Sequence, residues 1–312
     1  MIRMEIIDKS LLYLPKRKEV NILQMVNQMV KAKEEYSLNE AESAYLVFKW
    51  ISQNIEINFY DEDLDDPINS YNSGKGNPKS LSSLFNNICT FLKVESDSIS
   101  GYLKWANKDN EIKNDIDYTW NYIEINGEYY LLDVSMAANM KYSNSDYIFL
   151  YFGTEPEIFI LLHYPKESKW QLLSEPYTFE TFESMACLNP FFYFIGFKTI
   201  SPNTTKLLGH GKIILTSDIL IPRNDIAYSC LTKYGESTYG DFDEYDGTLK
   251  NEIEYNLDKD ECLLFTISAV PKNSNTFETI AYFDIKYSKN SSLNFESNSL
   301  LNSNYNYNNY IE

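Results

Sequence analysis

The stretch YTWNYIEI-NG-EYYLLDVS, residues 118–135, decides the fold. Two runs rich in aromatic and β-branched residues flank an Asn-Gly dipeptide, which suits the two-residue type I′ turn of a β-hairpin. This turn would pair Ile125 with Glu128. Counting outward then places Tyr118 and Asp133 diagonally on one face of the hairpin, within side-chain reach. We therefore expect an antiparallel sheet that brings these two side chains together.

Helical periodicity precedes the hairpin. Residues 18–36 and 40–51 carry apolar side chains at helical spacing, and Ser37 and Glu40 form a capping-box pattern at the start of the second helix. Residues 81–92 repeat apolar side chains at i, i+3, i+4, i+7 and i+11, which predicts a third, amphipathic helix.

The segment 54–79 is dominated by Asp, Asn, Ser, Gly and Pro, so we expect a long loop between the second and third helices. A strand is expected over 98–105, and 147–162 predicts a strand or short helix, a turn and an apolar helix. This order of elements places the loop-to-helix junction at 76–80 close to both strands of the hairpin.

The character of the chain changes after the hairpin region. Short β-like runs separated by turn residues predict a β-sandwich over about 195–288. The last segment is rich in Asn and predicts a disordered tail. The expected organisation is α+β: a first domain over 1–188, a β-sandwich domain over 189–288 and the tail over 289–312.

Composition limits the classes of function. The 312 residues are 44% apolar and 23% charged, which is the balance of a globular protein. A net charge of −18 disfavours nucleic acids and anionic membrane surfaces, and it allows a basic protein partner. The start of the chain has no secretory pattern and the four cysteines are scattered, so a reducing cytoplasmic compartment fits best. No motif indicates a cofactor.

Five segments in a fixed order resemble the transglutaminase-like superfamily, in its kyphoscoliosis-peptidase branch. In that family a nucleophilic Cys begins a core helix, a His opens one strand and an Asp lies on the neighbouring strand. The resemblance covers about residues 40–185. The segments that carry it are GNPKSLSSLF (76–85), YTWN (118–121), YYLLDVSM (129–136), YFGTEPEIFI (151–160) and HYP followed by WQLL (163–173).

The departures from the family pattern fall on the positions of the catalytic residues. The resemblance places Pro78 at the nucleophile and Tyr118 at the base, and it keeps the acid as Asp133. Gly76 is kept as well, whereas Ser80 replaces the second glycine of the motif. Proline has no nucleophilic atom, and tyrosine is a poor base at neutral pH. The Tyr118 hydroxyl is expected to donate a hydrogen bond to Asp133.

The resemblance therefore implies a catalytically silent, protein-binding or scaffold module, with an association with the cytoskeleton expected from the family. Papain-like clefts hold extended chains, so a peptide could bind in the altered cleft. We do not expect a metal site in that cleft. The candidate binding residues there are Asn77, Lys79, Ser80, Trp120 and Asn121.

Several alternatives stay open. A cysteine peptidase or transglutaminase with relocated catalytic residues would need a new Cys–His pair, for which Cys89, His163 and His210 are the candidates; we expect the first two to be structural. The acidic loops at 61–66 and 241–246 partly resemble calcium loops, although solvated acids are the simpler interpretation. A third class of function is a binding β-module that the first domain merely supports.

Overall fold

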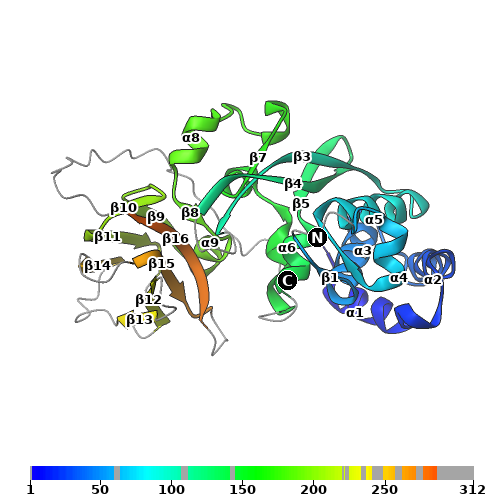
Figure 1. Cartoon of the computed structure of the whole chain (residues 1–312). Coiled ribbons are helices and arrows are strands. Elements are labelled where there is room, and N and C mark those ends of the chain that lie inside the picture. The colour runs from blue at the N-terminus through cyan, green and yellow to red at the C-terminus, as the bar shows by residue number, and fades with distance from the viewer. Residues whose placement is uncertain are drawn as a thin grey trace.

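The computed structural model shows one region of helices and a long sheet, and a second region of β-structure, joined by the green segment that contains α8 and β8 (Figure 1). Helices and mainly antiparallel sheets together confirm the predicted α+β class. The structure describes residues 2–59, 64–106, 112–140, 145–219, 221, 225–232, 237–240, 249–256, 262–271 and 277–286.

Three helices form the start of the first region. They are α1 (Met4–Tyr13), α2 (Ile22–Glu35) and α3 (Glu40–Asn54). The predicted cap of α3 at Ser37 is wrong. Asn39 is the N-cap, because its side chain accepts from the backbone N–H of Glu42 at 2.9 Å. The Glu42 carboxylate in turn accepts from the backbone N–H of Asn39. Ser37 instead lies in the turn that leaves α2, with φ +48°.

The predicted loop at 54–79 contains a helix, so the prediction of unbroken loop was wrong. α4 (Pro67–Ser73) begins at Asp66, whose side chain accepts from the backbone N–H of Asn69 at 2.7 Å. It ends at Gly74, which has φ +77°. An acidic N-cap, a proline in the first turn and a terminal glycine are helix signals, which the density of turn residues concealed. Two short parallel strands flank it, β1 (Glu56–Ile57) and β2 (Lys75–Gly76).

The predicted amphipathic helix is α5 (Pro78–Phe91), and it packs against one face of the long sheet. The Ser82 hydroxyl lies 2.7 Å from the Ser98 hydroxyl of the sheet. The Asn121 amide donates to the Ser82 carbonyl at 3.1 Å and to the Asn86 side chain at 2.9 Å. These polar contacts fix α5 across the sheet, beside α3 and α4 (Figure 1).

The sheet has five antiparallel strands in the order β6-β5-β4-β3-β7. The predicted hairpin register is confirmed, since Ile125 pairs with Glu128 across the Asn-Gly turn. The return strand ends at Leu132 rather than at Ser135, because Asp133 caps α6 (Val134–Asn139). The strands are β3 (Glu95–Ala106), β4 (Ile112–Ile125), β5 (Glu128–Leu132), β6 (Phe152–Thr154) and β7 (His163–Pro165).

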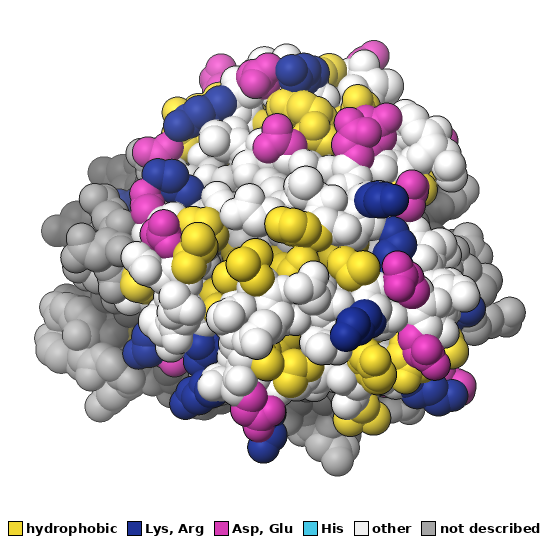
Figure 2. All heavy atoms as spheres, turned by 90° about the vertical axis from the view of Figure 1, so that its right-hand side faces the viewer, with side chains coloured by type: hydrophobic (Ala, Val, Ile, Leu, Met, Phe, Trp, Pro, Cys, Tyr) yellow, Lys and Arg dark blue, Asp and Glu magenta, His cyan; other side chains and the backbone are white. Residues whose placement is uncertain are grey.

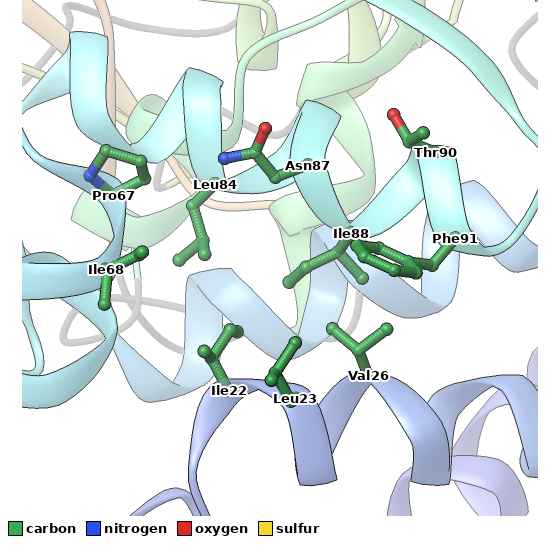
Figure 3. Close-up of a pocket in the computed structure, with 10 residues that line it drawn as sticks. All are labelled: Ile22, Leu23, Val26, Pro67, Ile68, Leu84, Asn87, Ile88, Thr90 and Phe91. Carbon is green, nitrogen blue, oxygen red and sulfur yellow. The ribbon is translucent and has the colours of Figure 1, made fainter.

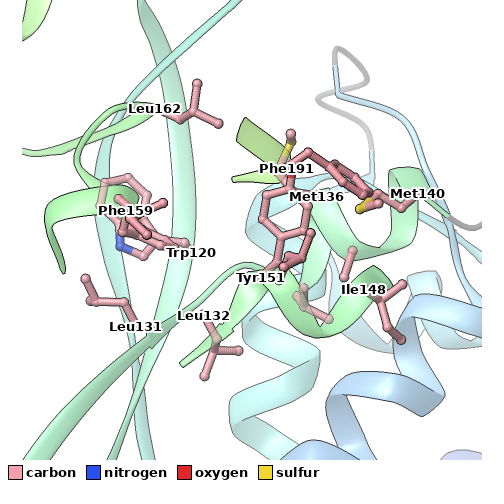
Figure 4. Close-up of a cluster of buried hydrophobic side chains, with 14 of the residues drawn as sticks. Trp120, Leu131, Leu132, Met136, Met140, Ile148, Tyr151, Phe159, Leu162 and Phe191 are labelled. Carbon is pink, nitrogen blue, oxygen red and sulfur yellow. The ribbon is translucent and has the colours of Figure 1, made fainter. Parts of the chain in front are cut away.

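Buried side chains cover both faces of this sheet (Figure 4). Trp120 packs on Phe159 with ring centroids 5.9 Å apart, while Leu132, Met136 and Tyr151 lie on the other side of the strands. The segment 147–162 supplies part of this cover. The remaining elements of the first region are α7 (Pro156–Phe159) and 3-10 helices at Arg17–Glu19, Ser145–Tyr151 and Ser168–Gln171. α8 (Phe179–Ser184) lies in the joining segment, and α9 (Phe191–Ile195) contacts strands of the second region.

The second region is the predicted β-sandwich. One sheet has the order β10-β16-β15-β12-β13, with β8 also paired to β16, and the other has the order β14-β11-β9. Tyr255 of one sheet packs on Phe265 of the other with ring centroids 5.3 Å apart. The strands are β8 (Cys187–Leu188), β9 (Phe197–Ser201), β10 (Lys206–Leu208), β11 (His210–Ser217), β12 (Ile226–Thr232), β13 (Ser237–Gly240), β14 (Lys250–Asn256), β15 (Cys262–Ala269) and β16 (Glu278–Lys286).

Contacts join the two regions. Trp105 of β3 lies 5.1 Å from Tyr282 between ring centroids, and the Ile112 N–H donates to the Asp284 carboxylate at 3.0 Å. The domain boundary at 188 stays a prediction, and the tail over 289–312 lies outside the described residues. Cys230 is disulfide-bonded, which the scattered cysteines did not predict. None of the described helices has the length and hydrophobicity to cross a membrane.

Candidate functional site

Asp133 is the centre of the candidate site. It lies between β5 and α6, and its side chain is fully buried. Its Oδ1 atom accepts from the backbone N–H groups of Ser135 at 2.8 Å and Met136 at 2.9 Å, and from the Tyr118 hydroxyl at 3.3 Å. Its Oδ2 atom lies 2.8 Å from Nε2 of His163. Both carboxylate oxygens are therefore occupied, by four partner groups from three places in the chain.

Tyr118 takes the predicted bond to Asp133. Its ring is buried and stacks on Phe59, with centroids 6.2 Å apart. Burial, followed by the nearby charge of Asp133, raises the pKa of the Tyr118 hydroxyl well above its ordinary value. The hydroxyl thus stays protonated and acts as a hydrogen-bond donor.

His163 is the residue that the sequence interpretation placed outside the triad. Its Nε2 faces Asp133, and its Nδ1 lies 3.2 Å from the Phe159 carbonyl oxygen. The imidazole stacks on the Phe159 ring at 4.0 Å and is 2% exposed. Because an acceptor occupies each ring nitrogen, the imidazole connects α7, β7 and Asp133. It has no free nitrogen for a substrate.

The sequence contained one signal for this contact. His163 begins the predicted HYP segment directly after an apolar helix, and β7 pairs with β3, where His163 is opposite Leu103. The chain gives no local sign that β7 joins the far side of β3. The pairing of His163 with Asp133 depends on that non-local step, so sequence reasoning missed it.

The start of α5 holds Pro78, the residue that the sequence prediction places at the nucleophile. Pro78 is the first residue of the helix, where its missing N–H costs nothing. Asn77 caps the helix by accepting from the Ser80 N–H at 2.9 Å, and the Ser80 hydroxyl accepts from the Asn77 N–H at 3.0 Å. A Cβ atom on Gly76 would lie 2.2 Å from Leu81, so packing explains why glycine stands there.

Lys79 is exposed and forms an ion pair with Asp65. The Asn77 amide also donates to Asp65 at 2.7 Å. Hydrogen bonds from Lys79 and Asn77 hold the pKa of the Asp65 carboxyl below its ordinary value. Asp65 is thus engaged in tying the loop to α5.

Asp66, the last acid of the loop at 61–66, caps α4, and the acids at 61–63 and 241–246 lie outside the described residues. Within the part of the chain that the structure describes, no three His, Cys, Asp or Glu side chains are close enough together to hold a metal.

Trp120 and Asn121 are buried as well, as are Asn77 and Ser80. The Trp120 ring meets His163 edge-on at 5.2 Å, while Asn121 binds α5. A partner at the surface cannot reach a buried side chain. Of the five candidate binding residues, the structure therefore leaves only Lys79 open to a partner.

Neither free cysteine lies in an activating environment. Cys89 is buried on α5 beside Ser96, and burial raises the pKa of its thiol above the ordinary range. Burial also raises the pKa of the Cys187 thiol, to about 12. His210, the third candidate, is an exposed residue at the start of β11 rather than in a turn, and it is paired with Asn256 across the strands.

A second feature is an apolar groove of about 250 Å³ between α2, α4 and α5. Figure 3 shows its side chains converging from the three helices, and apolar patches are visible on the same side of the molecule in Figure 2. Its lining has no ionisable group, so it suits apolar contact rather than acid–base chemistry. The lining residues are Ile22, Leu23, Val26, Pro67, Ile68, Leu84, Asn87, Ile88, Thr90 and Phe91.

Three curated relatives match this chain in sequence. Hillarin of Drosophila melanogaster is 24% identical over 278 residues, covering 79% of this chain and 32% of that protein. The kyphoscoliosis peptidase of Mus musculus is 24% identical over 217 residues, covering 65% and 33% respectively. The LIM and transglutaminase domain protein ltd-1 of Caenorhabditis elegans is 23% identical over 178 residues, covering 50% and 24%.

The chain is similar to transglutaminase-like proteins. It spans about a third or less of the length of these relatives. No protein-family model matches it. A solved structure described as a TGase aligns with 35% of this chain and with 30% of its own chain. The two are 8% identical, and the TM-score is 0.28. An overlap of this size leaves the fold to be judged from the helices and strands described above.

Proposed function

We propose that this chain is a catalytically silent, transglutaminase-like protein that binds other proteins. The observation that carries the proposal is the set of bonds around Asp133. The acid that should orient a catalytic histidine is instead bonded to Tyr118, to His163 and to the start of α6. All of these groups are buried.

An acyl-enzyme route needs a thiolate next to a free imidazole nitrogen. The family resemblance places Pro78, the first residue of α5, at the nucleophile, and the two free cysteines have raised thiol pKa values. Both ring nitrogens of His163 already face acceptors. These observations support a structural role for residues that form an active site in related enzymes.

The relocated-enzyme alternative predicts that the full chain turns over acyl substrates, whereas the proposed function predicts no turnover. We expect no transamidation of a glutamine-containing protein with a fluorescent amine, and no hydrolysis of peptide substrates. We also expect a thiol-reactive acyl analogue to leave Cys89 and Cys187 unlabelled in the native protein and to label them after denaturation. Native labelling of Cys89 that is lost in a His163→Gln variant would establish the enzyme instead.

The binding role needs its own test. Lys79 is the exposed member of the candidate cleft, so Lys79→Glu should weaken capture of a cleft-bound partner without affecting folding. Lys250→Glu is a suitable control, since Lys250 is also exposed and forms an ion pair with an acid, Glu252, on β14 of the second region. Equal capture by the two variants would move the binding surface away from the cleft. The cytoskeletal and cytoplasmic assignments stay predictions from the family resemblance.

A further inference from the structure

At the far end of the sheet face that carries Trp120, the side chains of Glu95, Asp97 and Tyr129 are exposed. The strand register places two rows of side chains across β3, β4 and β5 at that end. One row is Asp97, Tyr122 and Leu131, and the other is Glu95, Glu124 and Tyr129. In antiparallel strands, residues directly opposite each other point to the same side. The rows therefore combine carboxylates and aromatic rings on one surface.

Three aromatic rings form a cluster on this surface. Tyr122 stacks on Trp170 with centroids 4.4 Å apart and ring planes 21° apart. Tyr129 meets both rings edge-on, at 5.3 Å from Tyr122 and 5.5 Å from Trp170. Tyr129 is 44% exposed. We call the surface the aromatic–acidic face; it consists of Glu95, Asp97, Tyr122, Glu124, Tyr129 and Trp170.

The carboxylates of this face lack compensation. Glu95 stands directly opposite Glu124, and like charges in that position destabilise a sheet. Neither forms an ion pair with any of the cationic side chains that the structure describes. After burial itself, nearby Asp97, Tyr129, Glu95 and Glu124 raise the pKa of the Tyr122 hydroxyl. The three carboxylates therefore lie close enough to Tyr122 to act on its hydroxyl.

Lys169 forms a cation–π contact with the Trp170 ring. The Lys169 ammonium lies 5.1 Å from the centroid of the Trp170 ring, and Glu167 pairs with the same ammonium at 2.9 Å. Tyr122 stacks on one face of the Trp170 ring and Lys169 lies over the ring as well, so the exposed Tyr129 ring is the one left for a cation of a partner. Aromatic rings flanked by carboxylates attract such charges through the ring quadrupole and through Coulomb forces.

We propose that the aromatic–acidic face binds a Lys- or Arg-rich segment of a partner protein. Charge decides between the possible occupants. A second copy of this chain carries the same net charge of −18 and would be repelled, and a nucleic acid would be repelled as well. A basic segment gains contacts with the rings and relieves the repulsion between Glu95 and Glu124.

The inference extends the proposed function by naming the chemistry of a partner, and it uses a surface other than the altered cleft. The two can fail separately. Turnover of an acyl substrate would remove the proposed function and leave peptide binding unaffected, whereas absence of peptide binding would remove this inference and leave the lack of turnover unaffected.

The experiment measures binding of a fluorescein-labelled hexalysine peptide to the full chain by fluorescence anisotropy, with hexaglutamate as the negative peptide. The double variant Glu95→Gln/Glu124→Gln should raise the Kd about three- to tenfold at low salt, and less at physiological salt. Its control is Glu34→Gln/Glu35→Gln, which removes the same charge from exposed positions on α2. Equal changes in Kd for the two double variants would mean that the net charge of the chain, rather than this face, attracts the peptide, and would overturn the proposal.

The aromatic part has a matched control of its own. Tyr129→Ser should raise the Kd about two- to fivefold, because one exposed cation–π contact is lost. Tyr13→Ser removes a ring of nearly equal exposure, 45%, from α1 and should leave the Kd unchanged. Failure of hexalysine to bind the wild-type chain, or equal Kd values for these two variants, would overturn the proposal. Circular dichroism of each variant checks that it folds.

Discussion

The two ends of one face of β4 differ in what covers them. At one end Tyr118 and Trp120 lie under His163 and Phe159, and every polar partner of Asp133 is provided by the chain. At the other end Glu124 faces Glu95 without a described cation. The strand is continuous, so its backbone geometry does not explain the difference.

Cover by other segments explains it. Phe159 of α7 and His163 of the edge strand β7 pack on Tyr118 and Trp120 and exclude water, so that unpaired charge there would be costly. Trp170 covers the second end only in part, through its stack on Tyr122, so water screens the carboxylates. Substitutions at the buried end should therefore change stability, whereas those at the open end should change binding.

The largest effect should come from Asp133→Ala. The change removes the cap of α6 and leaves a buried imidazole and a buried hydroxyl without their acceptor, so the free energy of unfolding should fall by about 3–5 kcal/mol. Urea denaturation followed by circular dichroism measures it. Asp133→Asn keeps one acceptor oxygen for the cap and should lose less. A loss below about 1 kcal/mol for the alanine variant would contradict the expectation that substitutions at the buried end of β4 change stability.

A pH effect is expected from Lys104, a fully buried lysine on the neighbouring strand β3. Its Nζ donates to the Phe182 and Met185 carbonyls and lies 4.3 Å from the centroid of the Phe182 ring. Burial lowers its pKa from 10.5 to about 8. Between these values the unfolded chain binds more protons than the folded one, so the free energy of unfolding should rise with pH from about 8 to 10.

The expected gain over that range is about 2 kcal/mol relative to Lys104→Met, which has no titrating group at this position. Buried tyrosines titrate above this range and act in the same way in both proteins. Thermal or urea denaturation at several pH values and constant ionic strength gives the difference. Parallel pH profiles for the two proteins would show that the burial of Lys104 does not affect its protonation.

A smaller loss is expected for Tyr118→Phe, which removes only the hydroxyl that donates to Asp133. The bond is long, at 3.3 Å, so we expect a loss of about 1 kcal/mol in the free energy of unfolding. Tyr45→Phe is the control, since Tyr45 is equally buried and its hydroxyl has no hydrogen-bond partner among the described residues. Similar losses in both variants would assign the effect to packing rather than to the bond.

The smallest effect should come from the open end. Glu124→Gln relieves the repulsion with Glu95, so stability should rise by a few tenths of a kcal/mol at low salt, and the gain should shrink as salt is added. Glu35→Gln, an exposed change on α2, corrects for the change in net charge. A clear loss of stability, specific to Glu124→Gln, would mean that this carboxylate is paired in solution.

Local sequence signals predicted the elements whose causes are local. The Asn-Gly turn fixed the register from Ile125 to Glu128, and helical spacing located α5. Errors arose where two local signals competed. Ser37 was predicted to cap α3, but Asn39 caps it, and Asp133 was assigned to a strand, but its carboxylate caps α6.

The sequence by itself determined that Asp133 and Tyr118 would meet, because a two-residue turn and the alternation of side chains along a strand are local geometry. Only the tertiary structure decided that His163 would become the second partner of that acid, and that Glu95 and Glu124 would remain uncovered. The physical reason is that burial depends on which distant segments cross a strand, and neither the spacing nor the type of residues along one strand contains that information.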